Sequence, residues 1–314
     1  MSSNAGDELA TSIARTEPTR ALASVAVIIP CFNDGATLAE AIRSAQAQTR
    51  LDELIVVDDG STDHATLEIL SALEAEAVAV VHRLNGGPGA ARMSGVRVSQ
   101  ADYILALDAD DRLLPGALDA LAEVLDQDED VAIVWGDYQL FGDRSYRQRT
   151  ASVLDPWQIS YQDDLPVTAL IRRSALLAAG GWGEIGGYED WSLWMGLAEC
   201  SAEGRRVEFV VYEYRQHGVR SGSEFAAHHE ENYARLRSRH SALFAHRLAA
   251  WRRSRAPLAL RLALPVIFVL PISANRRRLL AGAACHLAHG RGVRLLLRRA
   301  RVEGLKAASP KDAR

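Results

Sequence analysis

Three carboxylates fall within four residues at Asp108-Ala109-Asp110-Asp111. Side chains of like charge at this spacing repel one another unless a cation or hydrogen-bond donors compensate them. Hard divalent ions such as Mg²⁺ and Mn²⁺ favour oxygen ligands, and they also bind diphosphate oxygens. A metal held here would stabilise the charge that develops on a departing phosphate group. The alternative is a solvated acidic turn that caps the next helix.

A second acidic pair, Asp58-Asp59, closes an apolar run that begins at Leu54. A carboxylate in this position is suited to accept hydrogen bonds from a ribose hydroxyl or from the N–H of a base. It is equally suited to cap the turn before Asp63, which we expect to begin a helix.

A third pair, Glu189-Asp190, lies between the glycine-rich segment 180–187 and the apolar segment 191–198. This order predicts that both acids lie in the first turn of a helix, where the helix dipole favours negative charge. They are either an uninvolved cap or a general base that faces an acceptor hydroxyl. The neighbouring Trp182 and Trp191 either stack against a sugar ring or belong to the core.

The elements that must position these acids alternate along the chain. Apolar runs rich in β-branched residues predict strands, and apolar residues at helical spacing predict the helices between them. Such alternation indicates an α/β fold with a mostly parallel, Rossmann-like sheet flanked by helices, and ligands bind at the carboxyl ends of its strands. The acidic pairs follow two of these strands. We expect strands at 25–29, 54–57, 77–81, 103–107 and 131–135, and helices at 37–48, after 63, and at 90–98 and 116–125.

Six short motifs together resemble glycosyltransferase family 2, whose members have the GT-A fold. The resemblance covers roughly residues 24 to 222, and the motifs occur in the family's order. They are Val25-Ala-Val-Ile-Ile-Pro-Cys-Phe-Asn33, Glu53-Leu-Ile-Val-Val-Asp-Asp-Gly-Ser-Thr-Asp63, Asn85-Gly-Gly-Pro-Gly-Ala-Ala-Arg92, Leu107-Asp-Ala-Asp-Asp111, Gly187-Tyr-Glu-Asp-Trp191 and Tyr214-Arg-Gln-His217.

The resemblance implies a metal-dependent enzyme that inverts the anomeric carbon of a nucleotide-diphosphate sugar, most often a UDP-sugar. It implies that Asp190 is the base and that Glu189 supports it. It implies Mg²⁺ or Mn²⁺ at Asp110, Asp111 and His217. The implied donor site consists of Pro30, Phe32, Asn33, Asp59, Arg92 and Asp108. One departure is Met93, because the family often has Asn after this arginine.

Two other functions are compatible with parts of this pattern. A sugar-phosphate nucleotidyltransferase would share the fold class and the metal, but it should carry a glycine-rich basic loop where this chain has Pro30-Cys-Phe-Asn-Asp34. A catalytically silent scaffold would retain the fold and bind a nucleotide sugar without transfer. The chain contains no Walker-type phosphate loop, which disfavours a nucleoside triphosphatase.

Charge divides the chain into unlike parts. The net charge is −4, but residues 251–314 contain 15 Lys and Arg and only two acids, so residues 1–250 are strongly acidic. We expect a disordered lead at 1–22, a GT-A catalytic domain at 23–250, and a basic, partly apolar helical C-terminal extension at 251–314. Three widely spaced cysteines fit a reducing cytoplasm. The acidic body argues against a nucleic acid partner.

The C-terminal extension contains an apolar stretch at 257–272 that is interrupted by Arg261, Pro265 and Pro271. A membrane span needs about 20 clean apolar residues, so we do not predict one. Five arginines surround Leu295-Leu-Leu297, a pattern typical of helices that lie on an anionic membrane surface. We expect contact with the inner face of the cell membrane, where a lipid-linked saccharide acceptor would also lie. The alternative is packing on the catalytic domain or on another subunit, as in a homodimer.

Overall fold

A single curled sheet organises the computed structural model, which describes residues 22–143, 145–183, 185–216 and 228–288. Within these residues the strand order is β3-β2-β1-β4-β8-β6-β9-β5, and β7 pairs with β6. The strands are β1 (Val25–Cys31), β2 (Glu53–Asp58), β3 (Ala79–His82), β4 (Tyr103–Ala106), β5 (Arg112–Leu113), β6 (Val131–Gly142), β7 (Tyr146–Gln148), β8 (Ala169–Arg172) and β9 (Glu203–Gln216).

The N-terminal half of the sheet is parallel. β1 pairs with β2 on one side and β4 on the other, and β2 pairs with β3. Every residue of β1 and β4 is buried, as expected for strands covered on both faces. In register, Cys31 lies opposite Asp58 and Ile28 lies opposite Ala106, so the three strands end at one edge of the sheet.

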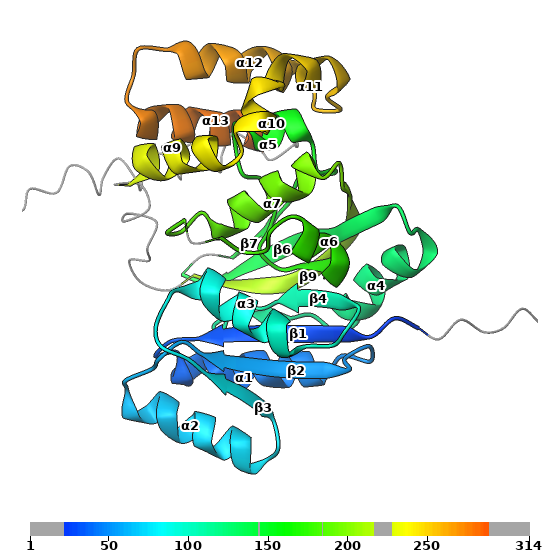
Figure 1. Ribbon diagram of the computed structural model, residues 1–314, viewed down its shortest axis with the longest axis vertical. Coiled ribbons are helices and arrows are strands. Elements are labelled where there is room, and N and C mark those ends of the chain that lie inside the picture. The colour runs from blue at the N-terminus through cyan, green and yellow to red at the C-terminus, as the bar shows by residue number, and fades with distance from the viewer. Residues whose placement is uncertain (1–21, 144, 184, 217–227, 289–314) are drawn as a thin grey trace, which may run out of the picture.

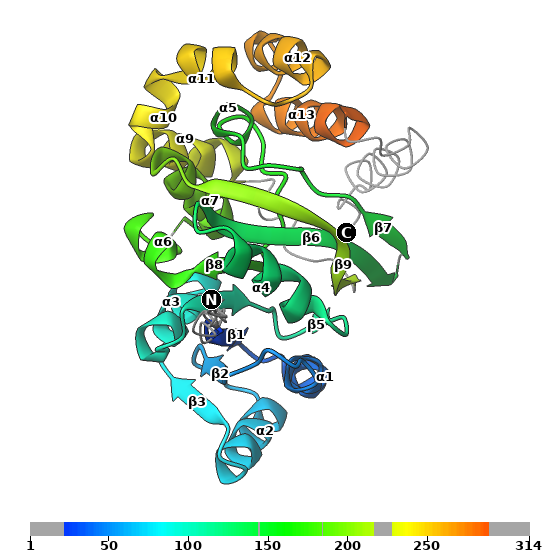
Figure 2. The same cartoon turned by 90° about the vertical axis from the view of Figure 1, so that its right-hand side faces the viewer.

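The C-terminal half of the sheet is mixed. β8 runs antiparallel to both β4 and β6, and the long β9 runs parallel to β6 and antiparallel to β5. The strand predicted to end at Trp135 continues to Gly142 because its second half pairs with both β7 and β9. Figure 2 shows β9 crossing this half of the molecule and ending beside β5. That crossing returns the chain to the edge where β4 ends.

Helices cover both faces of the sheet (Figure 1). One buried cluster joins the sheet to α1 (Gly35–Gln46), α2 (His64–Ala75) and α4 (Ala117–Gln127). A second joins it to α3 (Pro88–Val98), α6 (Arg173–Ala178) and α7 (Glu189–Glu199). Asp63 caps α2 as predicted, since its carboxylate accepts a 2.9 Å hydrogen bond from Thr66 N. The predicted α/β fold, with a mostly parallel sheet flanked by helices, is confirmed.

The described part of the C-terminal extension is helical and packs on the body. A third buried cluster places Leu260, Leu264 and Ala281 against Trp157 and Tyr161. Asp155 adds polar contacts, since its Oδ2 accepts from Ser254 Oγ at 2.9 Å and from Arg255 N at 2.8 Å. Within the extension lie the end of α11 (Arg247–Arg253), α12 (Leu258–Val269) and α13 (Ala274–Ala288). The other helices at this end of the molecule are α5 (Pro156–Ile159), α9 (His229–Arg239) and α10 (Ser241–Ala245).

No helix among the described residues has both the length and the apolar character needed to cross a bilayer. The apolar stretch predicted at 257–272 forms α12, whose interior includes Pro265. The leucines at 295–297 with their arginines, and the predicted N-terminal lead up to residue 21, lie outside the described residues.

Candidate active site

The acid cluster predicted from the sequence forms where β4 ends. One carboxylate oxygen from each of Asp108, Asp110 and Asp111 lies within 4.8 Å of the others. Asp110 and Asp111 are buried, and Asp108 is partly exposed. Burial raises the pKa of Asp111 well above its ordinary value, and the charge of Asp108 raises it further. Three converging carboxylates of this kind match the oxygen ligands that Mg²⁺ and Mn²⁺ prefer.

One oxygen in this cluster needs a partner that the described protein atoms do not supply. Asp111 Oδ1 accepts a 2.8 Å hydrogen bond from Arg215 N, whereas Asp111 Oδ2 is buried without a hydrogen-bond partner among the described residues. An unsatisfied buried carboxylate oxygen is costly. A divalent cation would satisfy it, so the residues present fit a metal.

Arg215, which the sequence analysis did not single out, braces this loop from β9. Its Nε donates to the carbonyl oxygen of Asp110 at 2.8 Å, and its Nη2 donates to Glu40 Oε2 at 2.7 Å. Together with the contact from its backbone N–H to Asp111, these bonds fix the turn that carries the acids. The only sequence signal was its position in the motif Tyr214-Arg-Gln-His217.

Arg92 connects the acid cluster to the predicted base. This residue of α3 is buried, and it donates from Nη2 to Asp108 Oδ1 at 2.7 Å and from Nη1 to Asp190 Oδ1 at 3.0 Å. Burial opposes the charge of the guanidinium, but Asp190 and Asp108 hold the pKa of Arg92 above its ordinary value. A charged arginine is therefore fixed between one carboxylate from the loop after β4 and one from the first turn of α7.

Glu189 and Asp190 lie in the first turn of α7, as the sequence predicts. Asp190 Oδ1 accepts from both Arg92 and Trp182 Nε1, the latter at 2.7 Å, while Oδ2 has no partner among the residues described. Burial raises the pKa of Asp190, whereas Arg92 lowers it and Asp108 raises it again. One oxygen is thus anchored, and the other is left to accept a proton.

Glu189 holds the loop before the helix. Its Oε1 accepts from Gly187 N at 2.9 Å, and burial raises its pKa. A Cβ placed on Gly89 would lie 2.8 Å from Glu189 Cγ, so only glycine lets the N-termini of α3 and α7 approach this closely. Gly89 was not among the predicted site residues, although it stands in the motif that ends at Arg92.

The predicted nucleotide side forms a second group, where β1 and β2 end. Asp59 is buried, and its carboxylate accepts from the Arg83 side chain and from the backbone N–H groups of Gly86 and Gly87, the last at 2.7 Å. Asn33 Oδ1 accepts from Thr62 N at 2.8 Å. This group is prearranged around two loops, and Arg83 is a member that the sequence analysis did not predict.

The remaining predicted residues differ in burial and in position. Phe32 is 45% exposed at the end of β1, whereas Pro30 is buried within the strand. Trp191 belongs to the core, where its Nε1 donates to the Ile159 carbonyl at 2.7 Å. His217, predicted as a metal ligand, lies outside the described residues.

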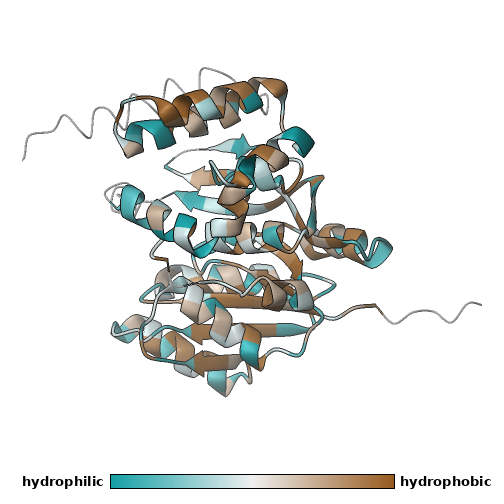
Figure 3. Ribbon diagram, turned by 45° about the horizontal axis from the view of Figure 1, so that its top comes forward, coloured by the Kyte–Doolittle hydropathy of each residue, from teal (hydrophilic) through white to brown (hydrophobic). Residues whose placement is uncertain are grey.

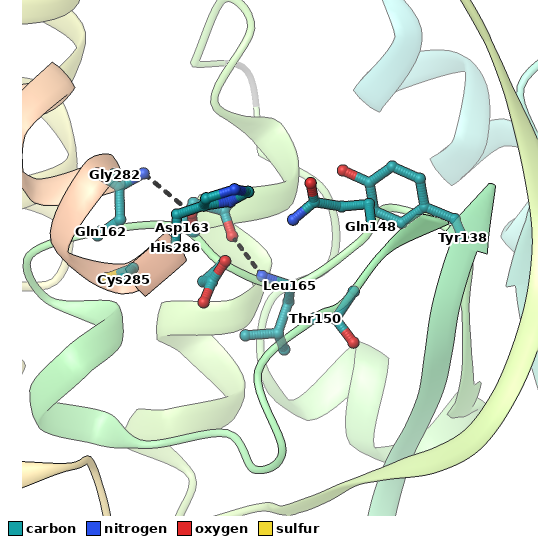
Figure 4. Close-up of a pocket in the computed structure, with 10 residues that line it drawn as sticks. Tyr138, Gln148, Thr150, Gln162, Asp163, Leu165, Gly282, Cys285 and His286 are labelled. Carbon is teal, nitrogen blue, oxygen red and sulfur yellow. Dashed lines mark hydrogen bonds between the residues drawn. The ribbon is translucent and has the colours of Figure 1, made fainter. Parts of the chain in front are cut away.

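A cavity of about 170 Å³ lies between the sheet and α13. Figure 4 shows Gln148 and Thr150 from the sheet side and Gly282 and His286 from α13 around it, with Asp163 at its wall. Burial raises the pKa of Asp163 well above its ordinary range, the hydrogen bond from Leu165 N opposes this, and the nearby charge of Asp190 adds to it. The cavity is therefore polar and lies within electrostatic reach of Asp190.

The sequence profile of the family described as Glycosyl transferase family 2 matches residues 26–177. The matched segment runs from β1 into α6 and contains Asp59, Arg92 and the acid cluster at 108–111. It ends before α7, so Glu189 and Asp190 lie beyond it.

Two curated relatives match over different lengths. An uncharacterized glycosyltransferase of Rickettsia conorii is 28% identical over 220 residues, which are 66% of this chain and 36% of that protein. The succinoglycan biosynthesis protein ExoU of Rhizobium meliloti is 38% identical over 106 residues, 33% of this chain and 30% of that protein. The chain spans only about a third of the length of these curated relatives.

The fold is also found in solved structures. The crystal structure of residues 1–349 of S. aureus TarS in complex with UDP-GlcNAc matches with a TM-score of 0.55 and 19% identity, covering 90% of this chain and 92% of that one. The complex of the same protein with UDP matches with a TM-score of 0.54 and 17% identity. The architecture described above is thus a GT-A fold.

Proposed function

We propose that this chain, whose residues 26–177 belong to glycosyl transferase family 2, transfers a sugar from a nucleotide-diphosphate sugar to an acceptor hydroxyl. The observation that carries the proposal is the buried Arg92, which joins the Asp108 carboxylate to the Asp190 carboxylate. This contact sets a base beside a cluster of acids suited to a metal-bound diphosphate. Both groups face the edge of the sheet where ligands of α/β proteins bind.

The donor is proposed to be a UDP-sugar. S. aureus TarS, which shares the fold, has been solved with UDP and with UDP-GlcNAc. In this chain, the buried Asp59 and the loops that carry Asn33 and Gly86 form the group best suited to hold a base and ribose. The diphosphate would then extend towards the acids after β4.

The cofactor is proposed to be Mg²⁺ or Mn²⁺ held by Asp108, Asp110 and Asp111. When bound, it would neutralise negative charge on the departing diphosphate. The unpartnered Asp111 Oδ2 supports this assignment, because a cation is the ligand that this buried oxygen lacks. Arg215 keeps the loop in place by holding the Asp110 carbonyl and the Asp111 carboxylate.

Asp190 is proposed as the general base of an inverting transfer. Its Oδ2 would take the proton of the acceptor hydroxyl as that oxygen attacks the anomeric carbon. The bond from that carbon to the diphosphate breaks, and its electron pair leaves with the phosphate oxygen. Arg92 and Trp182 hold Oδ1 throughout, which keeps the carboxylate aimed at the acceptor.

The acceptor is proposed to be a saccharide that enters through the cavity beside α13. Gln148, Thr150 and Asp163 provide amide, hydroxyl and carboxyl groups at its wall, which are the partners that sugar hydroxyls require. ExoU, a relative of this chain, is a succinoglycan biosynthesis protein, which supports a role in polysaccharide synthesis. A saccharide linked to a lipid would be one acceptor of this class.

The transfer itself is tested by replacing the base. With a panel of nucleotide sugars, Mn²⁺ and saccharide acceptors, we expect Asp190→Asn to lower the rate of nucleoside diphosphate release by about 10²- to 10⁴-fold. Binding of UDP should be retained, since the substitution leaves the donor side unchanged.

The matched control is Asp130→Asn, an exposed aspartate next to β6, which should release nucleotide at the unsubstituted rate. Retention of full activity by Asp190→Asn would remove the assignment of the base. Binding of a nucleotide sugar with no release under any condition would favour the catalytically silent scaffold.

A further inference from the structure

The outer face of α12 carries an apolar stripe. Leu258, Leu262, Val266 and Val269 are 63%, 58%, 58% and 80% exposed. Their spacing of four, four and three residues places all four on one side of the helix. Large aliphatic side chains in a row along an exposed helix are a contact surface and not a chance exposure of single residues.

The opposite face of α12 is also apolar. Leu260 and Leu264 are buried in the cluster that contains Trp157. The helix is therefore apolar on both sides, and its only charged residue is Arg261. A helix of this kind is normally covered all round, by protein or by lipid. In Figure 1, α12 lies at the end of the molecule opposite α2, and Figure 3 shows brown along the C-terminal helices.

Positive charge flanks the stripe at both ends. Arg252, Arg253 and Arg255 precede α12, Arg276 follows it, and all four are exposed. None of them forms an ion pair with another residue in the described ranges. Residues 251–288 contain seven arginines and no Asp or Glu. The stripe thus lies in a segment that has positive charges and no acid of its own.

This charge pattern discriminates between the two occupants that would cover the stripe. A two-fold dimer would bring the same surface of each copy together, and arginines would face arginines without an acid to pair with them. An anionic bilayer offers hydrocarbon to the aliphatic side chains and phosphate headgroups to the arginines. We propose that the α12 stripe and its flanking arginines dock this chain on an anionic lipid surface, with α12 lying in the plane of the membrane.

Co-sedimentation of the full chain with lipid vesicles tests the docking. One set of vesicles is phosphatidylcholine alone, and the other contains about one third phosphatidylglycerol. We expect partition onto the anionic vesicles to be at least about tenfold stronger than onto the neutral ones, and to weaken as salt is raised.

The variant Leu262→Gln with Val269→Gln leaves the charge unchanged and keeps a good helix former at both positions. It should weaken partition onto the anionic vesicles by about tenfold or more, because the apolar contact is lost. The control is Leu84→Gln, a leucine that is 91% exposed in the catalytic part and should bind as the unsubstituted chain does.

Equal binding of the double variant and the unsubstituted chain would overturn the proposal, because binding would then reside elsewhere. Failure of the unsubstituted chain to bind either vesicle would overturn it as well. Sedimentation velocity without vesicles tests whether a second copy of this chain covers the stripe instead. Self-association that the double variant abolishes, with vesicle binding unaffected, would make the stripe an interface between copies. These results need no sugar transfer, so they are independent of the proposed function.

Discussion

The guanidinium of Arg92 joins two carboxylates of the candidate site. It is buried between Asp108 and Asp190, and no other described cation contacts these two carboxylates. Removing one partner of a fully buried ion pair costs about 3–5 kcal/mol, because the remaining charge is left uncompensated. Since both aspartates keep some contact with solvent, we expect a smaller loss here.

We predict that Arg92→Ala lowers the free energy of unfolding by about 2–3 kcal/mol. Urea denaturation measures this change directly. The control Arg43→Ala removes an exposed arginine of α1 and should change the free energy of unfolding by less than about 0.5 kcal/mol. If the two variants had the same free energy of unfolding, the ion pairs of Arg92 would not stabilise the fold.

The sequence predicted the acids of the site better than their supports. Asp108, Asp110 and Asp111 could be named because three carboxylates follow a buried strand, where ligands of α/β sheets bind. Asp190 could be named because it stands in a motif that resembles the family. Arg215 and Gly89 could not be given their roles in this way. Their functions depend on a contact between β9 and the acid loop and on the close approach of α3 and α7, and neither contact is encoded in local spacing.

At the scale of elements, α12 has one buried face and one exposed face, and substitutions on the two faces should have different effects on stability. Leu264 is fully buried against the body, whereas Leu262, two residues away, is 58% exposed. We predict that Leu264→Ala lowers the free energy of unfolding by about 2–4 kcal/mol, because it leaves a cavity in the third cluster.

In the same helix, Leu262→Ala should change that free energy by less than about 0.5 kcal/mol, since most of this side chain is exposed to solvent. Urea denaturation of both variants distinguishes the two faces. Equal losses would mean that the helix does not sit on the body by the face that contains Leu260 and Leu264.

A buried histidine at the start of α9, His229, makes the stability of the fold depend on pH. The Nδ1 of His229 lies 2.6 Å from the Tyr188 hydroxyl oxygen, and burial, with Arg278 and Arg277 nearby, lowers its pKa from 6.5 to about 4. Between these two pH values the unfolded chain binds a proton at this histidine and the folded chain does not. The free energy of unfolding must therefore fall as pH falls through this window.

We predict that the His229 contribution to stability drops by about 2–3 kcal/mol between pH 7 and pH ~4.5, and that His229→Gln is spared this loss. Urea denaturation at the two pH values gives the difference. His64→Gln, which replaces an 87% exposed side chain, should retain the pH dependence of the unsubstituted chain. Identical pH dependence in all three proteins would show that His229 titrates normally when folded.

Elements were predictable where one residue pattern sufficed. β1, β2 and β4 each contain an uninterrupted apolar run, and the helices between them keep their apolar residues at helical spacing. β9 was not predicted, because its residues Glu203–Gln216 mix charged and apolar side chains and are mostly only half-buried. It becomes a strand through its long pairing with β6, a tertiary contact that outweighs local preference.

At the scale of the whole molecule, charge and apolar surface separate two ends. The edge of the sheet where β4 ends gathers buried carboxylates, whereas residues 251–288 have arginines and no acids. The asymmetry between an acidic body and a basic extension was visible in the sequence. Which face of α12 would stay exposed was not, because both faces are apolar and only the packing of Leu260 and Leu264 decides between them.

We expect one site to hold a nucleoside diphosphate through a metal bound by Asp108, Asp110 and Asp111. The most direct measurement is calorimetric titration of UDP into the full chain with and without Mn²⁺, repeated on Asp110→Asn. We predict binding that is at least about tenfold tighter with Mn²⁺, and loss of this metal effect in the variant. Equal UDP affinity with and without the metal, or a metal effect that survives Asp110→Asn, would contradict the account.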